Sequence, residues 1–226
     1  MSALLFVHVA LGGIAVFVGA VAFSTRKGAT MHVRFGRWFS VAMVASSVLG
    51  AVLGAIDYDQ YLITVFGAVL SITLIVGGVQ TVRDGTKPGS PIAYGIAGLN
   101  GLNATAIIVA GAMAKRAADS ELLGFPAEDY FFLAGMALVA LVGDIAYFLK
   151  RNTTSRHRVA RHLWRMSLGF FIAAGSAFTG PGMSAYPMYI QESGVLFLPE
   201  LIILMTMMFW FIKVRFSAQS VSHHSR

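Results

Sequence analysis

Seven runs of apolar residues alternate with short polar segments along the chain. Each run is close to the roughly 20 residues that an α-helix needs to cross a hydrocarbon core about 30 Å thick. The pattern predicts an all-α protein: a seven-helix transmembrane bundle in a single domain, 1–216, followed by a polar tail at 217–226. The predicted helices are about 3–25, 38–56, 61–82, 91–114, 130–149, 162–179 and 195–212.

Basic residues are divided unevenly between the two sets of polar segments. Of 17 Lys and Arg residues, 15 lie in or beside the segments that follow the first, third, fifth and seventh runs, and only Lys115 and Arg116 lie in the other set. Because cytoplasmic loops retain Lys and Arg, we expect the N-terminus outside and the tail in the cytoplasm.

Composition agrees with a membrane protein and removes several functional classes. Hydrophobic residues make up 57% of the chain and charged residues only 12%, against roughly 25% charged in soluble domains. The net charge of +7 is better explained by loops that face an anionic inner leaflet than by binding to nucleic acid, which we do not expect. The absence of cysteine excludes disulfides, thiolate metal sites and iron–sulfur clusters.

Small residues recur every fourth position on three predicted helices, which favours close helix packing over a pore lining. The same faces are candidates for homo-oligomer contacts. They are Ala42, Ser46, Gly50 and Gly54; Ala97, Gly101 and Thr105; and Gly169, Ala173 and Ala177.

Two basic segments are similar in order and spacing. RKGATMHVRFGRWF joins the first two predicted helices, and KRNTTSRHRVARHLW joins the fifth and sixth. Each runs from a basic pair through His and Arg to Trp. A duplication of a three-helix unit explains this, as in some transporters; the alternative is that cytoplasmic loops are commonly rich in Arg and interfaces in Trp.

Ionisable or polar groups inside the spans are the candidate functional residues, because each is costly in lipid. His8 and Glu200 lie at matched depth near the outer surface, and we predict that they interact. Asp144 lies about five residues, or roughly 8 Å, inside the inner end of the fifth helix. Arg165 reaches a similar depth on the next helix, so we predict an Asp144–Arg165 pair, with His162 on the second carboxylate oxygen and His162 or His32 as a titratable neighbour. Asn100 and Asn103 share one face of the fourth helix at mid-depth.

Histidines at the inner end suggest a metal or haem site only weakly. His32, His157 and His162 are the candidate ligands, and an axial haem pair would use His32 with His162, or His157 with one of them. None of the three lies at i, i+4 to another, whereas a helical metal site commonly uses that spacing.

The first helix, its loop and the start of the sixth helix carry one resemblance. His8, Gly12, Gly13, Gly19, RKG at 26–28, His32, FGR at 35–37 and RHLWRMS at 161–167 resemble uncharacterised bacterial multi-pass membrane proteins grouped as domains of unknown function. The similarity covers about the first 45 residues and 155–180. It implies a bacterial inner-membrane protein of unassigned activity. The resemblance does not indicate which substrate or cofactor, if any, such a protein binds.

Three functions remain open from the sequence. The first is a small-solute or proton-linked permease, because seven spans and short loops leave almost no extramembrane mass. The second is a redox protein that binds haem or a quinone at the inner histidines and arginines. The third is a structural or accessory subunit in which the polar residues only connect helices. The sequence contains no recognisable catalytic motif, so an enzymatic activity is not predicted.

Overall fold

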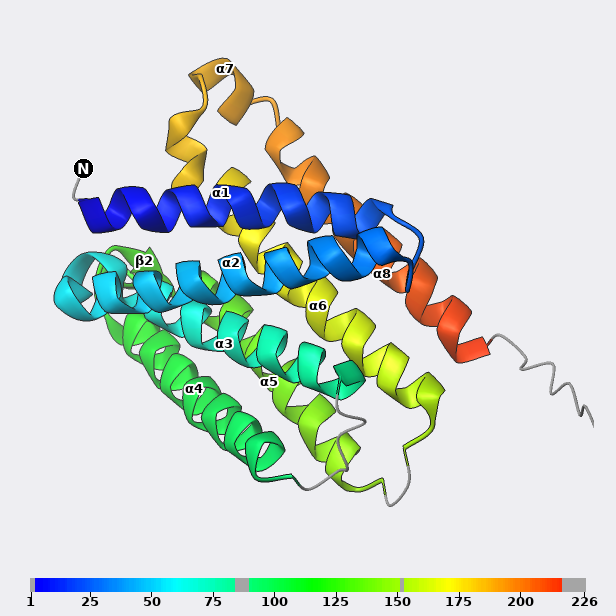
Figure 1. The fold of residues 1–226 in the computed structure, drawn as a ribbon. Helices are drawn as coiled ribbons and strands as arrows, with labels where there is room; N and C mark the ends of the chain where they lie inside the picture. Colours follow the sequence, from blue (N-terminus) through cyan, green and yellow to red (C-terminus); the bar gives the residue numbers. More distant parts are fainter. Residues whose placement is uncertain (1–2, 84–89, 151–152, 217–226) are drawn as a thin grey trace, which may run out of the picture.

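The computed structural model describes residues 3–83, 90–150 and 153–216, which form an all-α fold with seven long helices (Figure 1). Six of the helices in this part of the chain are long and apolar enough to cross a membrane, so the chain is a multi-pass membrane protein. The exception is α6, whose first half is rich in Arg and His. The predicted tail at 217–226 lies outside the described residues. The long helices are α1 (Ala3–Ser24), α2 (Thr30–Ile56), α3 (Tyr58–Arg83), α4 (Pro91–Arg116), α5 (Ala127–Phe148), α6 (Ser155–Phe178) and α8 (Leu198–Phe216).

The shorter elements lie in the two connections that we predict outside the membrane. Between α4 and α5, β1 (Glu121–Leu122) and β2 (Phe125–Pro126) form a small antiparallel hairpin, on which the Tyr130 hydroxyl donates to the Leu122 carbonyl at 2.9 Å. Between α6 and α8 lie η1 (Pro181–Ala185), α7 (Met188–Gln191) and η2 (Val195–Phe197). These elements are short, so the long helices make up most of the fold.

Helices α2 and α6 begin about two turns earlier than the hydrophobic runs predict, at Thr30 and Ser155. Both basic segments are therefore largely helical. Arg is a good helix former, and the Thr154 side chain caps α6 by accepting a hydrogen bond from the His157 amide. Hydropathy locates the lipid-buried part of a helix and not its ends. Arg34, Arg37 and Arg161 therefore project from helices, whereas Arg26 lies in the connection before α2.

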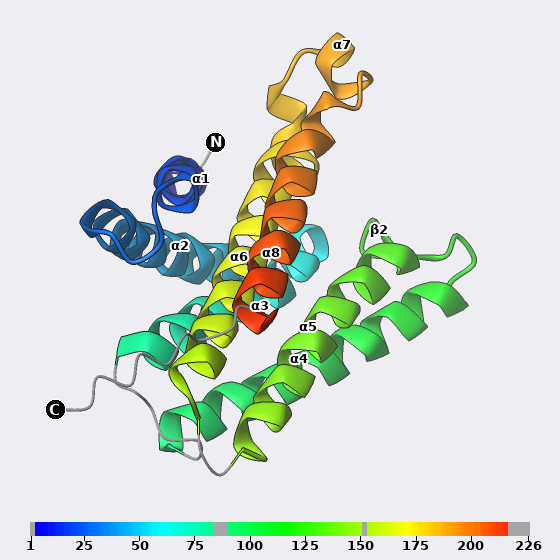
Figure 2. The ribbon, with the colours of Figure 1, turned by 90° about the vertical axis from the view of Figure 1, so that its right-hand side faces the viewer.

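The helices fall into two groups that meet at α3. Helices α1, α2 and α3 pack in order, and α6 packs on α3 and carries α8 on its other side. Helices α4 and α5 pack closely on each other but more sparsely on α3, and Figure 2 shows this hairpin diverging from α6 and α8. The predicted Asp144–Arg165 pair would place α6 beside α5, but α6 has α3 and α8 as its closest neighbours. It meets α5 through large side chains, because the Trp164 ring lies over Gly143.

The small-residue faces of the three helices are buried to different extents. All four predicted residues of α2 are buried, and a Cβ added at Gly54 would lie 2.7 Å from the Tyr61 carbonyl oxygen of α3. On α6, Gly169 and Ala173 are buried against α3 and its neighbours. On α4, Thr105 is exposed and the fully buried face is that of Asn100, Ala104 and Ile107 instead, so the predicted face is not a packing face within the chain. Its predicted role in homo-oligomer contacts stays a prediction.

Candidate functional site

Asp144, one turn before the end of α5, is completely buried and accepts hydrogen bonds on both carboxylate oxygens. Its Oδ1 accepts from Arg165 Nη1 at 2.5 Å and also from Arg161 Nη2. Its Oδ2 accepts from Asn100 Nδ2 at 2.7 Å. The predicted Asp144–Arg165 ion pair is therefore confirmed. A buried carboxylate without such partners would be neutralised or would destabilise the fold.

Arg165 is also completely buried and is held by the backbone of α3. Its Nη2 donates to the Thr73 carbonyl at 2.7 Å, and its Nε donates to the Leu74 carbonyl at 3.4 Å. The Thr73 hydroxyl donates to Asn100 Oδ1 at 2.5 Å. The cluster thus joins four helices: α3, α4, α5 and α6.

Gly77 provides the space in which the Arg165 guanidinium lies against α3. A Cβ placed on Gly77 would be 2.6 Å from Nη2 and 2.8 Å from Cζ of Arg165. Real Cβ atoms do not approach other atoms so closely, and the guanidinium is fixed by three partners. A side chain at this position would therefore displace Arg165 from Asp144.

Arg161 lies one turn before Arg165 on the same face of α6 and is the less enclosed of the two. Its Nη1 donates to the Thr81 hydroxyl at 2.8 Å, and its guanidinium carbon lies 4.2 Å from the centre of the Tyr147 ring. Its Nε is buried and has no hydrogen-bond partner. A cavity of about 10 Å³, lined by Gly77, Gln80, Thr81, Ala93, Ile96, Tyr147 and Arg161, adjoins this side chain; it has room for about one water.

The formal charges of the cluster do not cancel. Arg161 and Arg165 carry one positive charge each and Asp144 one negative charge, which leaves a net charge of +1. Among the described residues, Asp144 is the only carboxylate within ion-pair distance of either arginine. Burial of an uncompensated charge costs several kcal/mol, so the excess positive charge is the most unusual property of this site.

The predicted role of His162 on the carboxylate is wrong. His162 Nδ1 lies 3.0 Å from the Gly78 carbonyl oxygen of α3, and Asn100 occupies the oxygen that His162 was expected to bind. His32 Nδ1 lies 3.0 Å from the Ala22 carbonyl oxygen, and the two histidine rings meet edge to face with centroids 6.4 Å apart. These rings form a separate pair and not part of the Asp144 cluster.

The predicted interaction between His8 and Glu200 is also wrong. His8 Nδ1 lies 2.8 Å from the Ser46 carbonyl oxygen of α2, whereas Glu200 accepts a hydrogen bond from the Thr179 hydroxyl of α6. Near the opposite end of the bundle, Lys27, which follows α1, has its Nζ 5.9 Å from the ring centre of Trp210 on α8. Because α6 is the main partner of α8, the two predicted residues belong to different helix pairs.

Two other predictions concern amides and metal ligands. Asn100 and Asn103 are both buried on one face of α4, but only Asn100 joins the cluster, since Asn103 Nδ2 donates to the Phe66 carbonyl at 3.1 Å. The proposed three-histidine metal site is not formed, because no group of three possible His, Asp or Glu ligands exists within the described residues. Only His32 and His162 come together.

Sequence reasoning missed Arg161, which was counted among loop cations. The available signal was its position four residues before Arg165, which places both on one helix face once α6 is known to begin at Ser155. Thr73, Thr81 and Gly77 had no such signal, because nothing local marks which residues of α3 face an arginine 80 to 92 positions away.

No family model, no curated protein and no solved structure matches the chain. The resemblance to bacterial domain-of-unknown-function proteins therefore stays a prediction. The function has to be argued from the geometry of the site.

Proposed function

We propose that this protein is a proton-linked permease for small anions, which bind next to Arg161 in the cluster of Asp144, Arg161 and Arg165. The observation that carries the proposal is the buried net charge of +1, together with the unpartnered Nε of Arg161 beside a cavity. A bound monovalent anion would cancel that charge. Ionisable residues inside membrane bundles commonly mark such pathways.

The chemistry of the site favours a small, planar or compact anion. A guanidinium presents a rigid fork of donors that matches carboxylate-like oxyanions. The cavity holds about one water in this state, so a bulky solute does not fit without a larger rearrangement. Nitrate and chloride are therefore suitable probes.

The placement of the cluster supports a coupling between proton and anion. Asp144 and Asn100 belong to the α4–α5 hairpin, whereas both arginines belong to α6 in the other group of helices. In the proposed cycle, protonation of Asp144 removes its charge, frees Arg161 for the anion and weakens the ionic connection between the two groups. Rocking of one helix group against another is a common basis of alternating access.

The test is anion efflux from proteoliposomes loaded with sodium nitrate or sodium chloride, read with an ion-selective electrode and an internal pH dye. We expect wild-type vesicles to release anion together with protons, and Arg161→Gln to lose at least about tenfold in rate, equivalent to one charge-assisted hydrogen bond. Arg158→Gln is the matched control on the same helix, because within the described residues Arg158 hydrogen-bonds to the Ser155 hydroxyl and forms no ion pair with Asp144.

Two results would overturn the proposal. One is wild-type efflux equal to that of protein-free vesicles. The other is a folded Arg161→Gln protein with unchanged efflux, which would leave the cluster a connection between helices, as in a structural or accessory subunit. Folding of each variant is checked by its elution volume and thermal midpoint in detergent.

A second candidate function, a haem-binding redox protein, is favoured by one observation. His32 and His162 lie together, and each engages a backbone carbonyl through Nδ1, as metal-ligating histidines commonly do. An absorption spectrum of protein purified with haem available tests it: a Soret band lost in His32→Ala supports this function, and no Soret band rejects it.

A further inference from the structure

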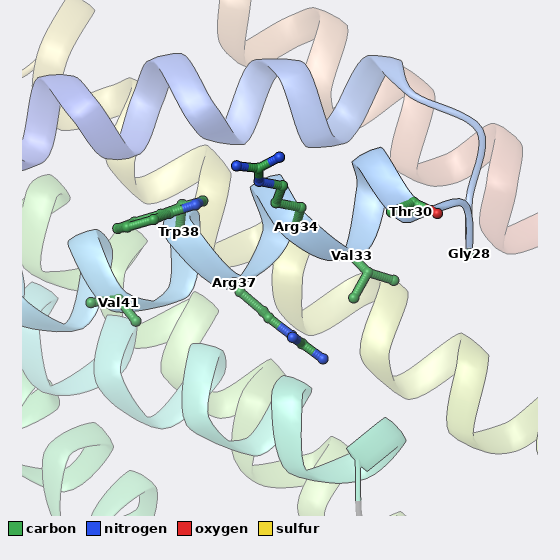
Figure 3. A pocket seen from close by; sticks show the side chains of 7 residues that line it. All are labelled: Gly28, Thr30, Val33, Arg34, Arg37, Trp38 and Val41. Atoms are coloured by element: carbon green, nitrogen blue, oxygen red, sulfur yellow. The ribbon is translucent and has the colours of Figure 1, made fainter.

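A groove of about 710 Å³ follows the first half of α2, away from the Asp144 cluster (Figure 3). Its main lining residues are Thr30, Val33, Arg34, Arg37, Trp38 and Val41. Trp38 and Val41 are 60% and 65% exposed, so the lining presents a large apolar surface to the surroundings. Figure 3 shows Arg34 extending toward α1 and Arg37 extending from the other side of α2.

The two arginines of this groove have no partner in the described part of the chain. Neither forms an ion pair or side-chain hydrogen bond there, and both are exposed. The reason is visible in the sequence, because residues 1–56 contain four basic residues and no Asp or Glu. Helices α1 and α2 therefore supply no carboxylate, and the positive charge of the groove is free for an external anion.

The position along α2 fits the membrane interface. Helix α2 has 27 residues and so is about 40 Å long, which exceeds a hydrocarbon core of about 30 Å. Its first turns therefore extend into the headgroup region. Trp is enriched at that level, and basic side chains there are attracted to an anionic leaflet.

We propose that this groove binds one anionic phospholipid. Arg34 and Arg37, on the two sides of α2, supply the positive charge that attracts the headgroup phosphate. The part of an acyl chain next to the headgroup lies over Val33, Trp38 and Val41. The charge of the arginines selects an anionic headgroup over a zwitterionic one, and the exposed apolar residues select a lipid over a free phosphate ion. The proposal does not depend on anion transport by the cluster.

Native mass spectrometry of the protein, released from detergent after incubation with defined lipids, tests the proposal. We expect the wild-type protein to retain one more bound lipid molecule when the lipid is phosphatidylglycerol than when it is phosphatidylcholine. The double variant R34Q/R37Q should lose that difference. The double variant K115Q/R116Q is the control, because it removes two exposed cations at the end of α4. Trp38→Ala should lower lipid retention without a change of charge.

The outcomes separate the possible sources of the phosphate. Equal retention of phosphatidylglycerol by R34Q/R37Q and by wild type would overturn the proposal, as would an equal loss in K115Q/R116Q. Displacement of the lipid by an equal concentration of inorganic phosphate would also overturn it, since that result assigns the groove to a free ion. The four substituted cations are exposed, so both variants should fold, which their thermal midpoints verify.

Discussion

The basic segments at the start of α2 and at the start of α6 have similar composition but opposite surroundings. Arg34 and Arg37 are exposed along a groove and have no carboxylate among the described residues. Arg161 and Arg165 lie inside the bundle on Asp144. The local sequence therefore does not decide whether a cation enters the bundle. Burial of the cation depends on whether another helix provides a carboxylate.

The energetic reason is the cost of removing a charge from water. Desolvation of an ion costs several kcal/mol even after relaxation, and only a close opposite charge with further hydrogen bonds compensates for it. Arg165 has both, from Asp144 and from the Thr73 carbonyl. The arginines of α2 have neither, so they remain at the interface.

The comparison also bears on the suggested internal duplication. Helices α1 and α2 pack closely along each other, whereas α5 and α6 are not among the closely packed pairs and have Trp164 between them. A duplicated unit would repeat the packing of its first two helices. The similarity of the two segments is better explained by the common composition of basic interfacial segments.

The largest expected effect is that of Asp144→Asn. It leaves two buried arginines without a counter-charge, so we expect the free energy of unfolding to fall by about 3–5 kcal/mol. The double variant R34Q/R37Q should change it by no more than about 0.5 kcal/mol, as exposed substitutions usually do. Reversible unfolding in mixed detergent micelles provides both values.

Glu128→Gln is the control for Asp144→Asn, because Glu128 lies on the same helix and is exposed. A stability of Asp144→Asn within 1 kcal/mol of the control would mean that the buried arginines do not need the carboxylate. The contrast between the two basic segments would then have another cause.

A smaller effect is expected from Gly77→Ala. The new methyl group would collide with the Arg165 guanidinium, and such overpacking typically costs about 1–3 kcal/mol. Gly36→Ala is the matched change in the first basic segment, where a Cβ would meet nothing within 4 Å. It should be neutral or stabilise the protein by up to about 1 kcal/mol through helix propensity. Equal effects of the two substitutions would argue against the close contact of Arg165 with α3.

Much of the fold was predictable because lipid imposes one simple rule, a run of apolar residues for each crossing helix. The Asp144–Arg165 pair was predictable for the same reason, since a buried carboxylate demands a cation at its own depth. The predicted His8–Glu200 contact failed because depth does not identify neighbours, and α6 rather than α1 accompanies α8 along its length. Arg161 was missed because the basic residues in the first turns of a helix have the same composition as a cytoplasmic loop.

The smallest effect concerns Lys27, the half-buried cation of the first segment. Its ammonium donates to the Phe23 carbonyl and lies near the Trp210 ring, and burial lowers its pKa below the usual 10.5. The folded state therefore releases this proton at lower pH than the unfolded state. The free energy of unfolding should rise slightly as the pH increases from the lowered pKa toward 10.5, and Lys27→Gln should abolish that rise.

The contribution of Lys27 is measurable by denaturation of wild type and Lys27→Gln over a series of alkaline pH values. The difference in unfolding free energy between the two proteins should change with pH in the stated direction. A difference that is constant with pH, or that changes in the opposite direction, would show that burial does not oppose the charge of Lys27.

The unfolding free energy of Arg161→Gln shows whether the cluster holds one positive charge more than Asp144 can neutralise. We expect a change of less than about 1 kcal/mol, because the lost contacts to Asp144, Thr81 and Tyr147 are offset by the removal of an uncompensated buried charge. A loss as large as that of Asp144→Asn would contradict the account, since it would mean that both arginines are fully compensated in the folded protein.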